Sequence, residues 1–165
     1  MTRAALPFDP IDRGAELWAR SYDEVPRMRA ITSLMRVHQL VLTELDEIVK
    51  PFGLTFARYE VLVLLSFSRT GSLPLGKIGE RLQVHATSVT PLVQRLAAAG
   101  LIDRTRHPDD GRAVLASLTE KGRRVLEEAT EAVVSARFAL GAISEDQSDE
   151  LSAILRNIRL AAGDF

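Results

Sequence analysis

Residues 75–119 constrain the fold of this chain more than any other stretch. In order, they contain two short amphipathic segments, a glycine, and two strand-like runs around a charged turn. Leu75, Ile78 and Leu82 recur at helical spacing and predict a first helix over about 75–82. A tight turn is then predicted at Gln83, Val84 and His85, between this helix and the next. The pattern predicts a small helical domain that carries a β-hairpin.

A second helix is predicted over about 87–99, ending at Gly100, which suits a left-handed C-cap. Its apolar face holds Val89, Leu92, Val93 and Leu96. The other face is polar and short-chained, as a helix that lies in a DNA major groove requires. The members of that face are Thr87, Ser88, Thr90, Pro91, Gln94 and Arg95.

Pro91 lacks a backbone N–H and is tolerated only early in a helix, so the second helix is expected to begin near Thr87. Its ring offers a small apolar surface to a thymine methyl group. Beyond Gly100, the runs 101–106 and 113–118 read as two strands around the turn 107–112. This hairpin is the predicted wing.

The ordered set of helix, turn, helix, AAAGLIDR, DDGR and ASLTEKG resembles the winged helix-turn-helix of MarR-type bacterial regulators. The most specific part is Asp110 and Arg112 in the wing, followed by Leu118, Thr119 and Gly122. The resemblance covers nearly the whole chain. It implies a mostly α fold with a small β-hairpin wing, and N- and C-terminal dimerisation helices on either side. It also implies a homodimer that binds double-stranded DNA.

The flanking segments fit this organisation. Helices are predicted at 10–22, 26–50, 55–68 and 119–140, with a last helix opened by a capping box at residues 144–147. Asp9, Thr55 and Thr119 are the expected N-caps of three of them. The predicted division is 1–54 for the N-terminal dimerisation and scaffold helices, 55–118 for the DNA-binding lobe and 119–165 for the C-terminal dimerisation helices, intertwined as one domain.

The charge distribution supports a nucleic-acid partner although the net charge of the 165 residues is only −1. Residues 77–124 hold nine Lys and Arg against five Asp and Glu, which gives +4. Residues 1–76 hold nine of each, and residues 125–165 hold three against eight, which gives −5. Positive charge is therefore concentrated on the predicted DNA-binding lobe, where phosphates would use it. A solvated face without a partner is the alternative.

Specific roles follow for the DNA-binding residues. Arg112, on a hairpin tip, is placed to enter the minor groove, and Asp110 would orient it through a charge-assisted hydrogen bond. A surface Asp–Arg pair that pins the turn is the alternative. The expected base-edge contacts are Thr87, Ser88, Thr90 and Gln94. The expected phosphate contacts are Lys77, Arg81, Arg104 and Arg106.

The extra N-terminal helix with its Trp resembles the urate-responsive subset of MarR proteins. By that resemblance, the ligand-binding residues are Trp18, Arg36, Asp46 and Arg95, and the effector is a small anion, either urate-like or a tricarboxylate. The two arginines would pair the anion and Trp18 would stack on a planar one. The alternatives are core packing for Trp18 and surface ion pairs for Arg36 and Asp46.

Other functions find little support in the sequence. It contains no cysteine, which excludes disulfides and thiolate metal sites, and its three histidines lack metal-ligand spacing. There is no phosphate loop or nucleophile elbow, so neither an enzyme nor a cofactor is expected. No apolar run spans a bilayer and no signal peptide is evident, so a cytoplasmic protein without membrane contact is expected. The remaining alternatives are a winged-helix interaction module without DNA binding, and a regulator with no ligand.

Overall fold

The computed structural model describes residues 6–106 and 113–165, and the chain divides into two compact units. The first unit is Met1–Thr43 and the second is Glu44–Phe165. The long helix α2 (Val25–Val49) contributes to both units. Each unit is therefore described by itself.

The first unit consists of α1 (Pro10–Trp18) and most of α2. Asp9 caps α1 as predicted, because its Oδ1 accepts a hydrogen bond from the Ile11 N–H at 2.8 Å. Helix α1 ends before Tyr22, so the predicted apolar stripe continues beyond the helix, where the Tyr22 ring lies 4.7 Å from that of Trp18. An ion pair at 3.3 Å between Asp12 and Arg29 joins the two helices.

The second unit is the winged-helix lobe together with the C-terminal helix. After α2 its elements are η1 (Lys50–Phe52), α3 (Phe56–Ser66), β1 (Ser72–Pro74), α4 (Leu75–Leu82), α5 (Ala86–Ala98), β2 (Ile102–Arg106), β3 (Val114–Leu118), α6 (Glu120–Ser135), η2 (Arg137–Ala139) and α7 (Glu145–Ala161). The mostly helical fold with a small β wing is thereby confirmed. Both helices and both strands of the predicted 75–119 unit lie within one residue of their expected ends.

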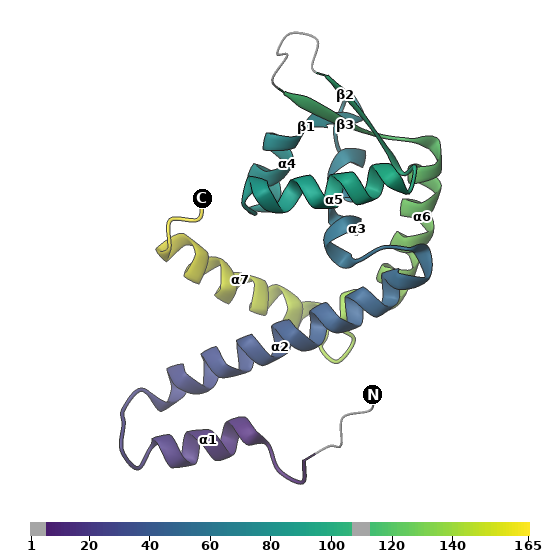
Figure 1. Ribbon diagram of the computed structural model, residues 1–165. Helices are drawn as coiled ribbons and strands as arrows, with labels where there is room; N and C mark the ends of the chain where they lie inside the picture. Colours follow the sequence, from purple (N-terminus) through teal and green to yellow (C-terminus); the bar gives the residue numbers. More distant parts are fainter. Residues whose placement is uncertain (1–5, 107–112) are drawn as a thin grey trace. The chain divides into compact units, whose positions relative to one another are not determined.

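Three antiparallel strands form the sheet, in the order β1-β3-β2. Ala116 of β3 pairs with Leu73 on one side and with Arg104 on the other. The strand β1 was not predicted, because three residues that end in a proline carry no alternation of apolar and polar side chains. Helices α3, α4 and α5 pack against this sheet, and Figure 1 shows β2 and β3 beside one another above α5 in the view.

The core of the lobe lies where α3, α4 and α5 meet the sheet. Its largest fully buried side chains include Val61, Leu62, Leu65, Ile78, Val89, Val93, Leu96 and Ile102. The predicted inward face of α5 is confirmed, with Leu92 half-buried at its edge. Across the two described ranges, no helix combines the length and the apolar character needed to cross a membrane.

One helix boundary of this unit differs clearly from the prediction. The helix after the wing ends at Ser135 rather than near Leu140, because residues 137–139 adopt left-handed φ angles of 49–58°, which a right-handed helix cannot include. Thr119 caps the start of this helix as predicted, and Ser144 and Gln147 form the predicted capping box of α7.

The expected cap of α3 is also different. Thr55 occupies the N-cap position, but its side chain makes no capping hydrogen bond. Instead, Oδ1 of Asp46, on the last turn of α2, accepts from the Phe56 N–H at 2.7 Å. A carboxylate from a neighbouring helix therefore satisfies the free amide that a local threonine was expected to satisfy.

Candidate nucleic-acid interface

The turn between α4 and α5 is held by backbone and side-chain hydrogen bonds. Gln83 ends α4 in a left-handed conformation with φ 54°, and the Val84 N–H donates to Gly79 O at 3.1 Å. His85 then occupies the N-cap of α5, and its Nδ1 accepts from the Thr87 N–H at 3.3 Å. Sequence reasoning placed His85 in the turn but missed its capping role, because histidine is not a usual N-cap residue.

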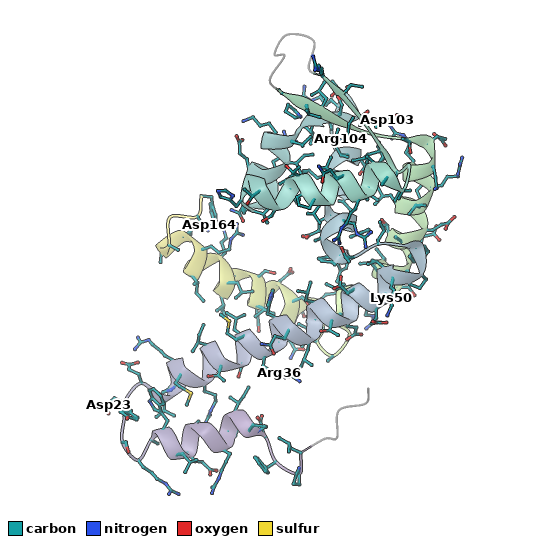
Figure 2. The ribbon with its side chains drawn as sticks, viewed as in Figure 1. Asp23, Arg36, Lys50, Asp103, Arg104 and Asp164 are labelled. Carbon is teal, nitrogen blue, oxygen red and sulfur yellow. The ribbon has the colours of Figure 1, made fainter. Side chains whose placement is uncertain are left out.

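The same turn also contacts Asp164, which follows helix α7. Gln83 donates from Nε2 to Oδ1 of Asp164 at 2.9 Å, and Arg159 donates from Nε to the other carboxylate oxygen at 2.5 Å. The hydrogen bond from Arg159 holds the pKa of Asp164 below its ordinary value of 3.8. Asp164 is labelled in Figure 2.

The outward face of α5 is exposed and polar, as the sequence predicts. Each predicted base-edge residue is exposed, and so are its neighbours: Thr87, Ser88, Thr90, Pro91, Gln94 and Arg95. The inward face of the same helix is anchored in the core by Val89, Val93 and Leu96. One helix thus has a fixed apolar side and a free side of short polar groups.

Pro91 lies deeper in the helix than expected. It is the sixth residue of α5, beyond the first turn, where a residue normally donates its N–H to the carbonyl four positions earlier. Because proline has no N–H, it cannot donate to the carbonyl of Thr87. The Thr87 carbonyl therefore lacks this helical hydrogen bond, near the start of α5.

Cationic side chains lie on both sides of α5. On β2, Arg104 and Arg106 are exposed and share a strand face, since side chains two positions apart point the same way; Arg104 is labelled in Figure 2. On α4, Arg81 is exposed and Lys77 pairs with Glu80 at 2.6 Å. An exposed pair of this kind contributes little to stability, so Lys77 remains available to a phosphate.

Asp110 and Arg112 lie outside the described residues. The strands that lead to them are in place, with Arg106 paired to Val114 at the end of the ladder. The roles of Asp110 and Arg112 at the wing tip therefore stay predictions.

The four predicted ligand residues divide between the two units. In the first unit, Trp18 donates its indole N–H to Asp23 O at 2.9 Å, and Arg36 makes a long hydrogen bond of 3.4 Å to Gln39. In the second unit, Asp46 caps α3 and Arg95 lies exposed on α5. The cap gives Asp46 a structural function, whereas its role toward a ligand stays a prediction.

An apolar groove between α3 and α6 was not anticipated from the sequence. It has a volume of about 790 Å³. Inside it, the hydroxyl groups of Tyr59 and Thr130 lie 3.2 Å apart and join the two helices, and the ring of Phe56 stacks against Tyr59 with centroids 5.7 Å apart. Partial burial raises the pKa of the Glu60 carboxyl, which also lines the groove. The site exists only because two helices pack together whose contacting residues, Tyr59 and Thr130, are 71 positions apart in the sequence.

Comparison with known proteins identifies the family. A model of the MarR family matches residues 54–114. The HTH-type transcriptional repressor MdtR of Bacillus subtilis is 32% identical over 132 residues, which cover 79% of this chain and 83% of MdtR. The chain belongs to the MarR family. This family assignment agrees with the resemblance found in its wing and helix-turn-helix.

Solved structures agree with this assignment. Sco5413, a MarR family transcriptional regulator from Streptomyces coelicolor, is 54% identical, with a TM-score of 0.79 over 86% of this chain and 98% of Sco5413. Sco3205 from the same organism, solved in complex with DNA, is 22% identical and shares the fold, with a TM-score of 0.74 over 83% of this chain and 88% of Sco3205. The protein is thus a winged-helix transcriptional regulator of the MarR family, and these relatives are named as regulators rather than enzymes.

Proposed function

We propose that this regulator represses transcription as a homodimer, with the α5 helix of each subunit in the major groove of one operator half-site. The observation that carries the proposal is the exposed polar face of α5, which lies on a helix whose other face is anchored in the core. A rigidly held helix with short hydrogen-bonding side chains suits base readout. MdtR, a repressor, and the DNA complex of Sco3205 support this role.

Each predicted residue has a specific role in this proposal. Thr87, Ser88, Thr90 and Gln94 contact base edges, and Pro91 contacts a thymine methyl. Lys77, Arg81, Arg104 and Arg106 neutralise phosphates. Arg112 enters the minor groove, oriented by Asp110.

The homodimer is supported by apolar side chains that the chain leaves exposed at its two ends. On α2, Ile31 and Met35 are 50% and 54% exposed, and on α7, Ile154 and Ile158 are 60% and 57% exposed. Burying such side chains against a second copy is favourable. A two-fold dimer would present its α5 helices to half-sites about one helical turn apart on a pseudo-palindrome. In this proposal residues 1–54 and 119–165 dimerise and residues 55–118 bind DNA.

The proposal includes release of the operator by a small anionic effector, of the urate-like or tricarboxylate class. Trp18, Arg36, Asp46 and Arg95 form its binding site. The support comes from the exposed guanidinium group of Arg95 on the recognition helix, and from the exposed face of Trp18, which is 40% exposed. An anion that binds Arg95 while repelling Asp46 would displace α5, which couples the effector to DNA.

A fluorescence-anisotropy titration tests this function, with the DNA upstream of the gene, at two salt concentrations. Tight binding that weakens with salt is expected, because phosphate contacts release counterions. Arg112→Ala should weaken binding by about 1–3 kcal/mol through the loss of its groove contact. Arg13→Ala on α1, whose guanidinium pairs with Glu16, is the matched control and should change nothing.

The outcomes separate the proposed steps. Addition of urate or of a tricarboxylate should weaken DNA binding, and the effective compound identifies the effector class. Trp18→Ala should abolish that response while DNA affinity is kept. If neither anion changes the affinity for DNA, the proposed effector class is wrong, whereas the proposed DNA-binding regulator is retained. If no duplex binds, the interaction module without DNA binding replaces the proposal.

A further inference from the structure

A hydrogen bond joins two segments of the second unit that lie far apart in the sequence. Nε2 of Gln83, in the turn between α4 and α5, donates to Oδ1 of Asp164 at 2.9 Å, and the two residues are 81 positions apart. Asp164 follows α7, and Figure 2 labels it at the end of that helix. The contact therefore links the segment proposed to dimerise with the helix-turn-helix proposed to bind DNA.

The backbone at the end of α7 gives Asp164 a defined position. Gly163 has a left-handed φ angle of 68°, and its N–H donates to Leu160 O at 3.0 Å. The N–H of Asp164 donates to Arg159 O at 3.1 Å. These two bonds form a Schellman motif, which ends a helix at a left-handed glycine. The Asp164 side chain is thus presented from a hydrogen-bonded helix end.

Side chains of α7 support the Asp164 carboxylate. Nε of Arg159 donates to Oδ2 of Asp164 at 2.5 Å, while Gln83 donates to Oδ1. The hydrogen bond from Arg159, and to a smaller extent that from Gln83, lowers the pKa of Asp164. The ring of Phe165 lies 4.9 Å from Cζ of Arg159 and 5.2 Å from Cζ of Arg156, within the range of a cation–π contact. Both oxygens of the carboxylate are therefore used, one within α7 and one across to the turn.

Gln83 stands directly before the start of the recognition helix. It has a left-handed φ of 54°, and the N–H of the next residue, Val84, donates to Gly79 O at 3.1 Å. His85 follows and caps α5 by accepting from the Thr87 N–H. Because only one residue separates Gln83 from this cap, a restraint on Gln83 also restrains the first turn of α5.

We propose that Asp164 is a positioning residue for DNA binding, which fixes the α4–α5 turn relative to α7 and so sets the distance and rotation between the two recognition helices of a dimer. This inference rests on the proposed function, because it needs a dimer whose α5 helices reach two half-sites. A lobe held by this contact fits one half-site spacing. A lobe released from it adapts to several spacings and binds the original one less tightly.

Hydrogen exchange of the full chain without DNA, followed by mass spectrometry, tests the contact. Asp164→Ala should speed the exchange of the backbone amides of residues 83–88 by about threefold or more, because a hydrogen bond that restrains the turn is lost. Asp149→Ala removes the same charge from an exposed position of α7, so it is the matched control and should leave this exchange unchanged. Circular dichroism verifies that each variant is folded.

A reversed hydrogen bond separates this contact from the mere loss of a side chain. Gln83→Glu puts a second carboxylate against Asp164 and should also speed exchange, because like charges repel. Addition of Asp164→Asn should return exchange to within about twofold of the parent. The new amide then donates to the new carboxylate, while its carbonyl oxygen accepts from Arg159. Unchanged exchange in Asp164→Ala, or no recovery in the double variant, would overturn the contact.

Operators of altered spacing test the consequence for DNA. Footprinting first locates the half-sites, and one base pair is then inserted between them, which rotates one half-site by roughly 35° about the DNA axis. The parent protein should prefer the original spacing. In Asp164→Ala the ratio of the two affinities should be smaller by about threefold or more. A general loss of stability would weaken binding to both operators alike and would leave this ratio unchanged.

The two measurements separate the possible failures. The same spacing preference in the parent and in Asp164→Ala would overturn the positioning role, even where exchange of the turn is faster. Failure of the parent to bind any duplex would overturn the proposed function and, with it, the role of Asp164 in DNA binding. Hydrogen exchange would still decide whether Asp164 restrains the turn, because it is measured without DNA.

Discussion

The winged-helix lobe and the N-terminal helices differ in how they bury their apolar side chains. In the lobe, Leu62, Leu65 and Ile78 are fully buried by elements of the same chain. Among residues 6–43, Ala15 alone is buried, while Trp18 and Ile31 stay largely exposed. The lobe has its own core, whereas the N-terminal helices leave apolar side chains exposed. Similar apolar periodicity therefore serves a core in one region and an exposed apolar surface in the other, which the proposed dimer would bury.

The largest loss of stability is expected from a glycine substitution in the packed lobe. A Cβ atom at Gly122 would lie 2.0 Å from the carbonyl oxygen of Leu101, and this backbone contact cannot move aside. Gly122→Ala should lower the free energy of unfolding by roughly 3 kcal/mol. The measurement is urea denaturation followed by circular dichroism.

The same substitution in the other region is its control. Nothing lies within 4 Å of a Cβ atom added to Gly14 of α1. Gly14→Ala should leave the protein equally stable or up to about 1 kcal/mol more stable, because alanine favours the helix. Equal losses from the two variants would contradict the contrast between a packed lobe and open N-terminal helices.

The exposed apolar side chains of α2 sharpen the comparison. Ile31→Ala combined with Met35→Ala should weaken dimerisation by about 2 kcal/mol, because two large side chains are lost from the interface. Sedimentation equilibrium measures this as a dissociation constant roughly 30-fold higher. Arg27→Ala on the same helix, paired with Glu24, is the control. An unchanged dimer would place the interface elsewhere.

Removal of the helix cap at Asp46, where α2 enters the lobe, should have a smaller effect on stability. Asp46→Ala removes the hydrogen bond to the Phe56 N–H and should lower stability by about 1 kcal/mol, as the loss of a helix cap does. Thr55→Ala should matter less, because the Thr55 side chain makes no capping bond. The two unfolding curves decide the point, and a larger loss for Thr55→Ala would refute the assignment of the cap to Asp46.

The smallest effect concerns pH. The pKa of Glu60 is raised above its ordinary value of 4.5, so the folded protein holds this proton more tightly than the unfolded chain does. Stability should therefore decline as pH rises from 4.5 through the raised pKa. Glu60→Gln should remove this part of the decline, whereas Glu16→Gln on α1 should retain it. Identical profiles of stability against pH for the parent and the Glu60→Gln protein would contradict the raised pKa of the Glu60 carboxyl.

Several elements could be predicted because their signals are local. The spacing of Val89, Val93 and Leu96 fixed the inward face of α5, and Gly100, with φ 71°, ends it as a glycine C-cap does. The capping box at Ser144 was read from two residues three positions apart. The exposed polar face of the recognition helix followed from the same periodicity, since the residues opposite a buried stripe must face outward.

Other features could not be predicted because they join distant parts of the chain. Strand β1 exists only because Ser72–Pro74 pair with β3, about 40 residues later. Asp46 replaces Thr55 as the cap of α3 because two helices meet at that point. The break after Ser135 carries no glycine or proline to signal it.

By itself, the sequence determined the family, the order of the main helices and of the two hairpin strands, and which face of α5 is exposed, since each is encoded by residues within a few turns of one another. The tertiary structure decided which apolar residues form a core and which stay exposed, and it created the carboxylate-rimmed groove between α3 and α6. The physical reason is that burial and desolvation depend on neighbours in space. Glu60 shows this, because its place beside α6 partly removes its carboxyl from water and raises its pKa.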